Sequence, residues 1–237
     1  RVIMPEEYKQ MSNDELYEII QKELYVNDAK VTNNFYHKKN AEYLERLLYI
    51  CPHCGLSVFE SHGDKLACKK CNREYQYLPT KELQGVGFES PFRFINDWYE
   101  YQKTFVNKMD PNEYVAEPMY RETASFSEVI VYKHKEPIKE NASIELYGDR
   151  IIIDETINNL KDQRGIKKTI REYGIDEKVF LFDEVTAISV LGRNKLNIYH
   201  DKKVYQLKGN KRFNAIKYVH MYYRYKNVNK GEGHEQF

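Results

Sequence analysis

The chain has 237 residues, of which 41% are hydrophobic and 14% aromatic, and its formal net charge is +1. This length and composition allow one large or two small cores. The longest apolar runs, such as residues 150–154, are far too short to span a bilayer. No signal-peptide pattern opens the sequence, so we expect its thiols to lie in a reducing compartment.

Charge is divided unevenly along the chain. Residues 1–120 contain 15 basic and 19 acidic side chains, whereas residues 121–237 contain 22 basic and 17 acidic ones. The modest basic excess of the second half permits an anionic partner, either lipid headgroups or nucleic acid, but does not require one.

Residues 1–46 are predicted to be helical. Ser12 and Glu15 match a capping box, in which each side chain satisfies a free amide at the start of a helix. The apolar residues that follow recur at helical spacing and predict one stripe: Leu16, Ile19, Ile20 and Leu24. A second helix is predicted over residues 41–48, with inward-facing Leu44, Leu47 and Leu48.

All four cysteines of the chain lie in two C-x2-C pairs, Cys51 with Cys54 and Cys68 with Cys71. Such a pair places two sulfurs on one side of a tight loop, and two facing loops complete a tetrahedron. The spacing therefore predicts a four-thiolate zinc site. Two disulfides or four free thiols are the alternatives. We favour them less because a chain of this size rarely needs disulfide bonds for its stability.

Residues 47–80 are predicted to form a zinc ribbon around this site. Strands are expected over residues 56–61 and 65–67, with a turn at 62–64, and over residues 74–77. Few apolar residues lie here, so the metal is expected to supply much of the stability. Because four thiolates fill the shell, the zinc is predicted to be structural, with His53 outside the ligand set and His62 a solvated turn residue.

Residues 81–123 are predicted to contain one helix and a linker. Ser90 and Pro91 match a helix start with proline in the first position. The predicted buried stripe comprises Ile95, Trp98, Gln102, Phe105 and Val106. The polar stretch 80–89 is expected to separate this helix from the ribbon, and the proline-containing stretch 110–123 to form the main linker.

Residues 124–237 change to a pattern of short β-branched and aromatic segments. Strands are predicted over residues 129–132, 144–147, 150–153, 169–173, 179–182, 187–190, 196–199 and 204–207, and a closing helix over residues 212–226. Meandering strands followed by one helix are the plan of a pleckstrin-homology-like (PH-like) barrel. The predicted fold class is therefore α+β: N-terminal helices and a zinc ribbon, then a PH-like β-barrel with a C-terminal helix. A generic α+β domain is the alternative.

The sequence contains no G-x-S-x-G, no H-E-x-x-H, no His-x4-Asp and no phosphate-binding glycine loop. Its clearest basic cluster, Lys133, Lys135 and Lys139, would lie in the first hairpin loop of the barrel, where lysines can bind anionic lipid. Ordinary solvated lysines are the favoured alternative, since Glu136 and Glu140 dilute the cluster.

Several segments resemble a bacterial acyltransferase family. Residues 1–7 and 11–20 look like the end of a 1-acyl-glycerol-3-phosphate acyltransferase domain. The segments that resemble the C-terminal extension of Firmicutes-type members are residues 47–55, 68–71, 94–102, 180–185, 204–209 and 217–219.

The resemblance implies that the chain is the accessory, non-catalytic part of a longer enzyme. That family transfers a fatty acyl group to lysophosphatidate at the cytoplasmic face of the membrane. Its catalytic His-x4-Asp motif would lie upstream of Arg1, so no catalytic residue is carried over. The implied partners are the upstream acyltransferase domain and, for the barrel, anionic membrane lipid or a protein.

Two alternative functions come from other classes of protein. A nucleic-acid-binding zinc ribbon would use Phe59, Tyr75 and Tyr77 to stack on bases, but the ribbon's lysines and arginine exceed its acids by only one, too few for a phosphate backbone. An independent enzyme using surface carboxylates has no catalytic constellation behind it.

Overall fold

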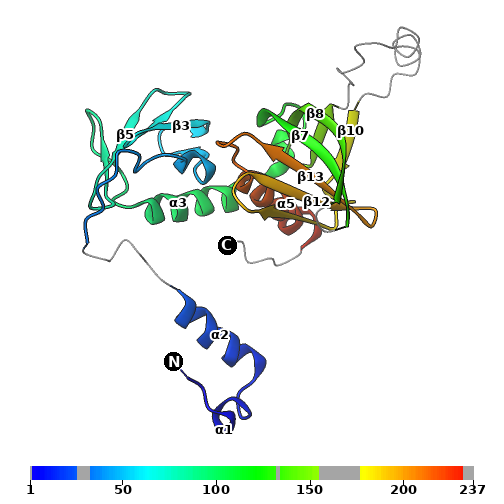
Figure 1. Ribbon diagram of the computed structural model, residues 1–237, viewed down its shortest axis with the longest axis horizontal. Helices are drawn as coiled ribbons and strands as arrows, with labels where there is room; N and C mark the ends of the chain where they lie inside the picture. The colour runs from blue at the N-terminus through cyan, green and yellow to red at the C-terminus, as the bar shows by residue number, and fades with distance from the viewer. Residues whose placement is uncertain (1, 26–32, 132–133, 155–176, 232–237) are drawn as a thin grey trace.

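A computed structural model describes residues 2–25, 33–131, 134–154 and 177–231 and shows a mixed helix and strand architecture (Figure 1). Two helices, α1 (Pro5–Tyr8) and α2 (Asn13–Leu24), come first. The predicted capping box is confirmed: Ser12 Oγ accepts from the Glu15 N–H at 3.2 Å, and Glu15 Oε2 accepts from the Ser12 N–H at 2.8 Å. No residue of α2 is buried, so its apolar stripe stays largely open.

The helix predicted over residues 41–48 is reduced to one turn of 3-10 helix, η2 (Leu44–Arg46). Tyr43 precedes it in the left-handed region, with φ of 75°, and donates its N–H to Ser61 Oγ at 2.8 Å. This long-range contact overrides the local helix pattern. The expected burial of Leu48 is confirmed.

A small antiparallel sheet follows in the order β3-β4-β5-β6. Its strands are β3 (Phe59–His62), β4 (Lys65–Cys68), β5 (Glu74–Tyr77) and β6 (Leu83–Gly85), and a separate two-stranded pair is formed by β1 (Ile50–Cys51) and β2 (Gly55–Leu56). The predicted hairpin turns at Gly63, whose φ of 65° suits glycine. Strand β6 lies in the stretch expected to be a polar separator, because Leu83 is buried against this sheet's core.

Helix α3 (Ile95–Lys108) begins later than the sequence predicts. The Asp97 carboxylate accepts the Phe94 N–H at 3.0 Å and sets the helix start, while the Ser90 hydroxyl binds the backbone of Phe92. The predicted stripe is confirmed at Trp98, Gln102 and Val106, which are all buried. The helix spans the distance between the small sheet and the larger one (Figure 1).

The predicted linker over residues 110–123 is packed structure for most of its length. It contains a 3-10 helix, η3 (Pro111–Tyr114), and strand β7 already begins at Tyr120. The Tyr120 hydroxyl donates to the Tyr49 carbonyl oxygen at 2.9 Å, and the Gly148 N–H donates to the Tyr114 carbonyl oxygen at 2.9 Å. Hydrogen bonds to Tyr49, just before β1, and to Gly148, just after β8, thus hold this segment in place.

Within the described residues, the larger sheet has seven antiparallel strands in the order β10-β9-β8-β7-β13-β12-β11 and curls into a half-barrel (Figure 1). The strands are β7 (Tyr120–Val131), β8 (His134–Leu146), β9 (Arg150–Asp154), β10 (Glu177–Leu181), β11 (Ala187–Leu191), β12 (Lys195–His200) and β13 (Lys203–Gly209). Register shifts along the β7–β8 pair bend both strands. The predicted strand over residues 169–173 lies outside the described residues.

Helix α5 (Ile216–Lys230) packs Tyr218 and Met221 into the core of this sheet. It begins at Ile216 instead of Arg212 because Asn214 Oδ1 accepts the Ile216 N–H at 3.0 Å and caps the helix. The coarse prediction of an α+β chain with a curled sheet and a C-terminal helix is confirmed.

Candidate metal centre

Two short hairpin-like loops carry the four cysteines. Cys51 ends β1 and Cys54 precedes β2, so the first pair lies on the tight turn between two strands in direct register. Gly55 has a φ of 75°, a conformation that other residues adopt only with strain. Cys68 ends β4, and Cys71 follows it in a turn that Asn72 closes with a φ of 57°. The sequence thus places each pair on a bend.

The four sulfur atoms lie together, within 4.8 Å of one another. The Cys51 and Cys71 Sγ atoms are 3.7 Å apart, and the Cys54 and Cys68 Sγ atoms are 3.6 Å apart. A tetrahedral ion with metal–sulfur bonds of about 2.3 Å has sulfur–sulfur edges of about 3.8 Å. The two measured edges match this value, so the residues present fit a tetrahedral metal ion. No disulfide joins these residues, since all four cysteines are free.

Donor groups surround the sulfur atoms. The backbone N–H groups of His53 and Cys54 point at Cys51, and those of Lys70 and Cys71 point at Cys68. The Ser57 hydroxyl lies 2.9 Å from Cys68 Sγ. Burial disfavours the Cys68 thiolate, but these donors outweigh it and lower the pKa of Cys68 to about 7. Burial dominates at Cys51 and raises the pKa of that thiol.

An aromatic core seals the cysteine cluster from one side. Trp98 contacts the Phe59 ring edge-on at a centroid distance of 5.4 Å, and the Tyr75 ring at 4.6 Å. All three side chains are buried. Phe59 and Tyr75 are therefore not available to stack on bases, whereas Tyr77, the third aromatic residue of the nucleic-acid alternative, is half-buried.

The two histidines considered in the ribbon lie outside the ligand set. His53 is exposed, and among the described residues the group of potential ligands comprises the four cysteines alone. His62 Nε2 contacts Glu60 Oε1 at 3.0 Å on the surface of β3. A metal ion held by all four sulfurs would have a complete tetrahedral shell.

The predicted lipid-binding lysines are not on a common loop. Lys133 lies outside the described residues, whereas Lys135 and Lys139 belong to strand β8. The Lys139 side chain is 5% exposed and its Nζ lies 3.1 Å from Asp154 Oδ2. Residues 134–139 form a strand because β8 pairs with β7 from Leu146 as far as His134. This pairing extends well beyond the apolar segments from which strands are predicted.

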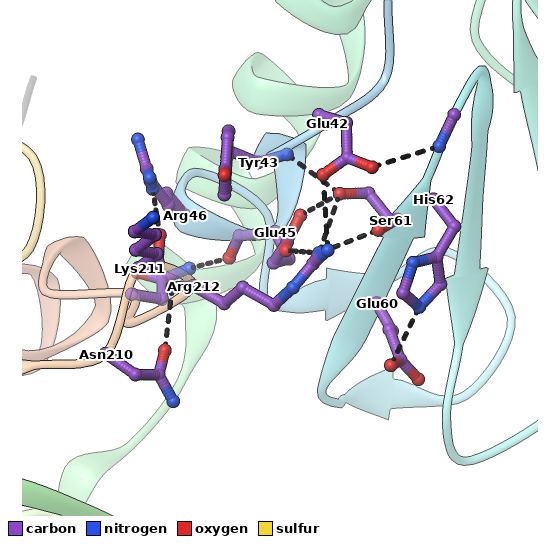
Figure 2. A network of polar contacts seen from close by, with 12 residues as sticks. Glu42, Tyr43, Glu45, Arg46, Glu60, Ser61, His62, Asn210, Lys211 and Arg212 are labelled. Atoms are coloured by element: carbon purple, nitrogen blue, oxygen red, sulfur yellow. Dashed lines mark hydrogen bonds and ion pairs between the residues drawn. The ribbon is translucent and has the colours of Figure 1, made fainter. Parts of the chain in front are cut away.

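A polar network joins the small sheet to the large one, and sequence reasoning missed it (Figure 2). The Arg212 guanidinium donates to Glu45 and to the Ser61 carbonyl oxygen, the latter at 2.7 Å, and pairs with Glu42 at 3.2 Å. Glu45 is only 4% exposed. No local pattern could reveal contacts between residues so distant in sequence.

Neither a protein-family model nor a curated protein matches this sequence. Among solved structures, the chain is similar to the N-terminal PH domain of ARAP2 protein from human, with 7% sequence identity and a TM-score of 0.32. That match covers 49% of this chain and 86% of the human domain's chain. Within the described residues, no helix is long and apolar enough to cross a membrane.

Proposed function

We propose that this chain is a non-catalytic accessory region in which a structural zinc ribbon is fastened to a PH-like barrel. The observation that carries the proposal is the set of four sulfurs, with measured edges of 3.6 and 3.7 Å. Four thiolates in a tetrahedron suit zinc, and such a closed shell leaves no site for a reacting group. The ligands would be Cys51, Cys54, Cys68 and Cys71.

The metal would contribute to the folding stability of the small sheet. Outside the aromatic cluster around Trp98, the small sheet buries few side chains. Bound zinc would hold β1, β2 and β4 together and so stabilise the surface against which α3 packs.

Chelation tests this role. Treating the reduced protein with a strong chelator should open residues 47–85 to a protease while the larger sheet stays resistant. Unchanged resistance of the small sheet would contradict the structural role. A Ser57→Ala variant is a useful control, because it removes one donor to Cys68 but no ligand.

The PH-like part of the proposal is supported by strand order. Numbered from β7, the seven strands follow the spatial order 4-3-2-1-7-6-5, and the next element is the helix α5 that fills the curl of the sheet. A meander bent on itself and plugged by a C-terminal helix is the expected barrel plan.

The proposed parent is a membrane-associated lysophosphatidate acyltransferase of phospholipid biosynthesis, acting at the cytoplasmic face of the membrane. Support comes from the sequence resemblance and from α2. On that helix Ile20 is 44% exposed and Leu24 is 75% exposed. Such a stripe has no cover within the described residues and would suit the end of an upstream acyltransferase domain.

An activity assay separates the accessory region from an enzyme. The purified chain, given acyl donor and lysophosphatidate, should make no phosphatidate. Formation of phosphatidate above background would contradict the non-catalytic proposal. A His-x4-Asp motif upstream of Arg1 in the parent would support the acyltransferase assignment, and its absence would count against it.

A further inference from the structure

Two lysines face each other directly on neighbouring strands of the large sheet. Lys195 of β12 and Lys208 of β13 are register partners, and neither contacts a carboxylate within the described residues. Like charges placed directly opposite each other destabilise a sheet. A local arrangement that opposes stability points to a function.

A third lysine reaches the same face from β8. The Lys135 ammonium donates to Gln206 Oε1, and Gln206 stands two residues before Lys208 on β13, so both side chains lie on one face. Burial lowers the pKa of Lys135, and the charges of Lys195 and Lys208 lower it further. The three ammonium groups are therefore near enough to repel one another.

The floor between these lysines is polar and buried. Gln206 and Asn197 are register partners, 2% and 8% exposed, and Gln206 Nε2 donates to Asn197 Oδ1 at 2.7 Å. The Asn197 Nδ2 group has no acceptor among the described residues. The opposite face of the same strands packs Leu196 and Leu207 into the core. An amide donor that reaches solvent thus remains unused beside unpaired positive charge.

We propose that Lys135, Lys195, Lys208 and Asn197 form a binding site for a phosphoryl oxyanion on the outer face of β8, β13 and β12. Three ammonium groups and one amide donor match a doubly charged, tetrahedral group better than a singly charged carboxylate. The site differs from the loop predicted from Lys133, Lys135 and Lys139, and it goes beyond the proposed zinc-dependent function because it uses no ribbon residue.

Titration calorimetry with inorganic phosphate tests the site on the zinc-loaded chain. Lys195→Gln and Lys208→Gln should each weaken phosphate binding about tenfold. Lys202→Gln, which removes the same charge from the β12–β13 turn at the far end of these strands, should leave it unchanged. Asn197→Asp keeps the acceptor for Gln206 but adds a negative charge, and it should abolish binding.

Vesicle flotation identifies the source of the phosphoryl group. Phosphatidylcholine vesicles containing phosphatidic acid present an exposed phosphomonoester, whereas those containing phosphatidylserine present charge without one. Recruitment by phosphatidic acid alone, lost in Lys195→Gln, assigns a lipid headgroup. Binding of phosphate without recruitment assigns a small phosphorylated ligand.

Stability measurements keep the test independent of misfolding. Because Lys195→Gln and Lys208→Gln relieve repulsion, both variants should resist urea at least as well as the original chain. The proposal is overturned if the original chain binds neither phosphate nor phosphatidic acid, or if the lysine variants bind as tightly as the original.

Discussion

The indole Nε1 of Trp98 donates a hydrogen bond of 2.8 Å to the carbonyl oxygen of Ile50, the residue before the first cysteine. Through this bond the longest helix before the barrel touches the backbone of the metal centre. Gln102, one turn later on α3, receives the Tyr49 N–H at 2.9 Å. The position of the first cysteine pair is thus coupled to α3 and, through it, to the large sheet.

Replacing Trp98 with phenylalanine should therefore destabilise the chain by about 2–3 kcal/mol, since the change leaves a cavity and strands the Ile50 carbonyl oxygen. Urea unfolding measures the loss. Phe92→Leu, at a half-buried ring that also contacts Trp98, should cost less. Equal costs would show that the indole hydrogen bond contributes nothing.

The ion pair formed by Arg212 and Glu45 should stabilise the contact between the two sheets. Arg212→Met leaves the buried Glu45 carboxylate with the Ser61 hydroxyl but without its cationic partner. We expect a loss of about 2 kcal/mol, moderated because Arg212 is one-third exposed. Adding Glu45→Gln should restore part of that stability. A double-mutant cycle with no coupling energy would contradict this role.

Two buried tyrosines should respond differently to loss of the hydroxyl. The Tyr75 hydroxyl is buried with no hydrogen-bond partner in the described part of the chain, so Tyr75→Phe should be neutral or stabilising. The Tyr49 hydroxyl bonds His220 Nδ1, so Tyr49→Phe should cost about 1–3 kcal/mol. Thermal unfolding of both variants checks the order, and a reversed order would be inconsistent with these contacts.

His220 should make stability depend on pH. Burial, and then the charge of Lys103, lowers the pKa of His220 to about 3. The unfolded histidine takes up a proton below about pH 6.5 while the folded one does not, so stability is complete above that value and falls as the pH decreases toward 3. Between pH 7 and pH 5 the loss attributable to His220 is about 2 kcal/mol.

Urea unfolding of the original chain and of His220→Gln at both pH values isolates this contribution. The original chain should lose about 2 kcal/mol more than the variant. An identical pH dependence in the two proteins would show that His220 is not held neutral in the folded state.

The sequence predicts local features well where a residue type has a single physical role over a few neighbouring positions. The capping box at Ser12, the cysteine pairs and the turn at Gly63 all follow from short-range chemistry. Helix starts at Ser90 and Arg212 are wrong because Asp97 and Asn214 offer better caps further along.

Features that depend on distant partners are not visible in the sequence. Tyr43 leaves the helical region for Ser61, and Arg212 finds Glu45, through contacts that no periodicity encodes. The facing lysines on β12 and β13 likewise emerge only once the register of the two strands is known.

Metal content is the most direct measurement of the central claim. The purified, reduced chain should contain one zinc ion per molecule by elemental analysis, and cobalt substituted for zinc should give the thiolate charge-transfer and tetrahedral absorption bands of a four-sulfur site. Cys54→Ser and Cys68→Ser should each lose the metal or the spectrum. A metal-free chain with four freely titratable thiols and an intact, protease-resistant small sheet would contradict the account.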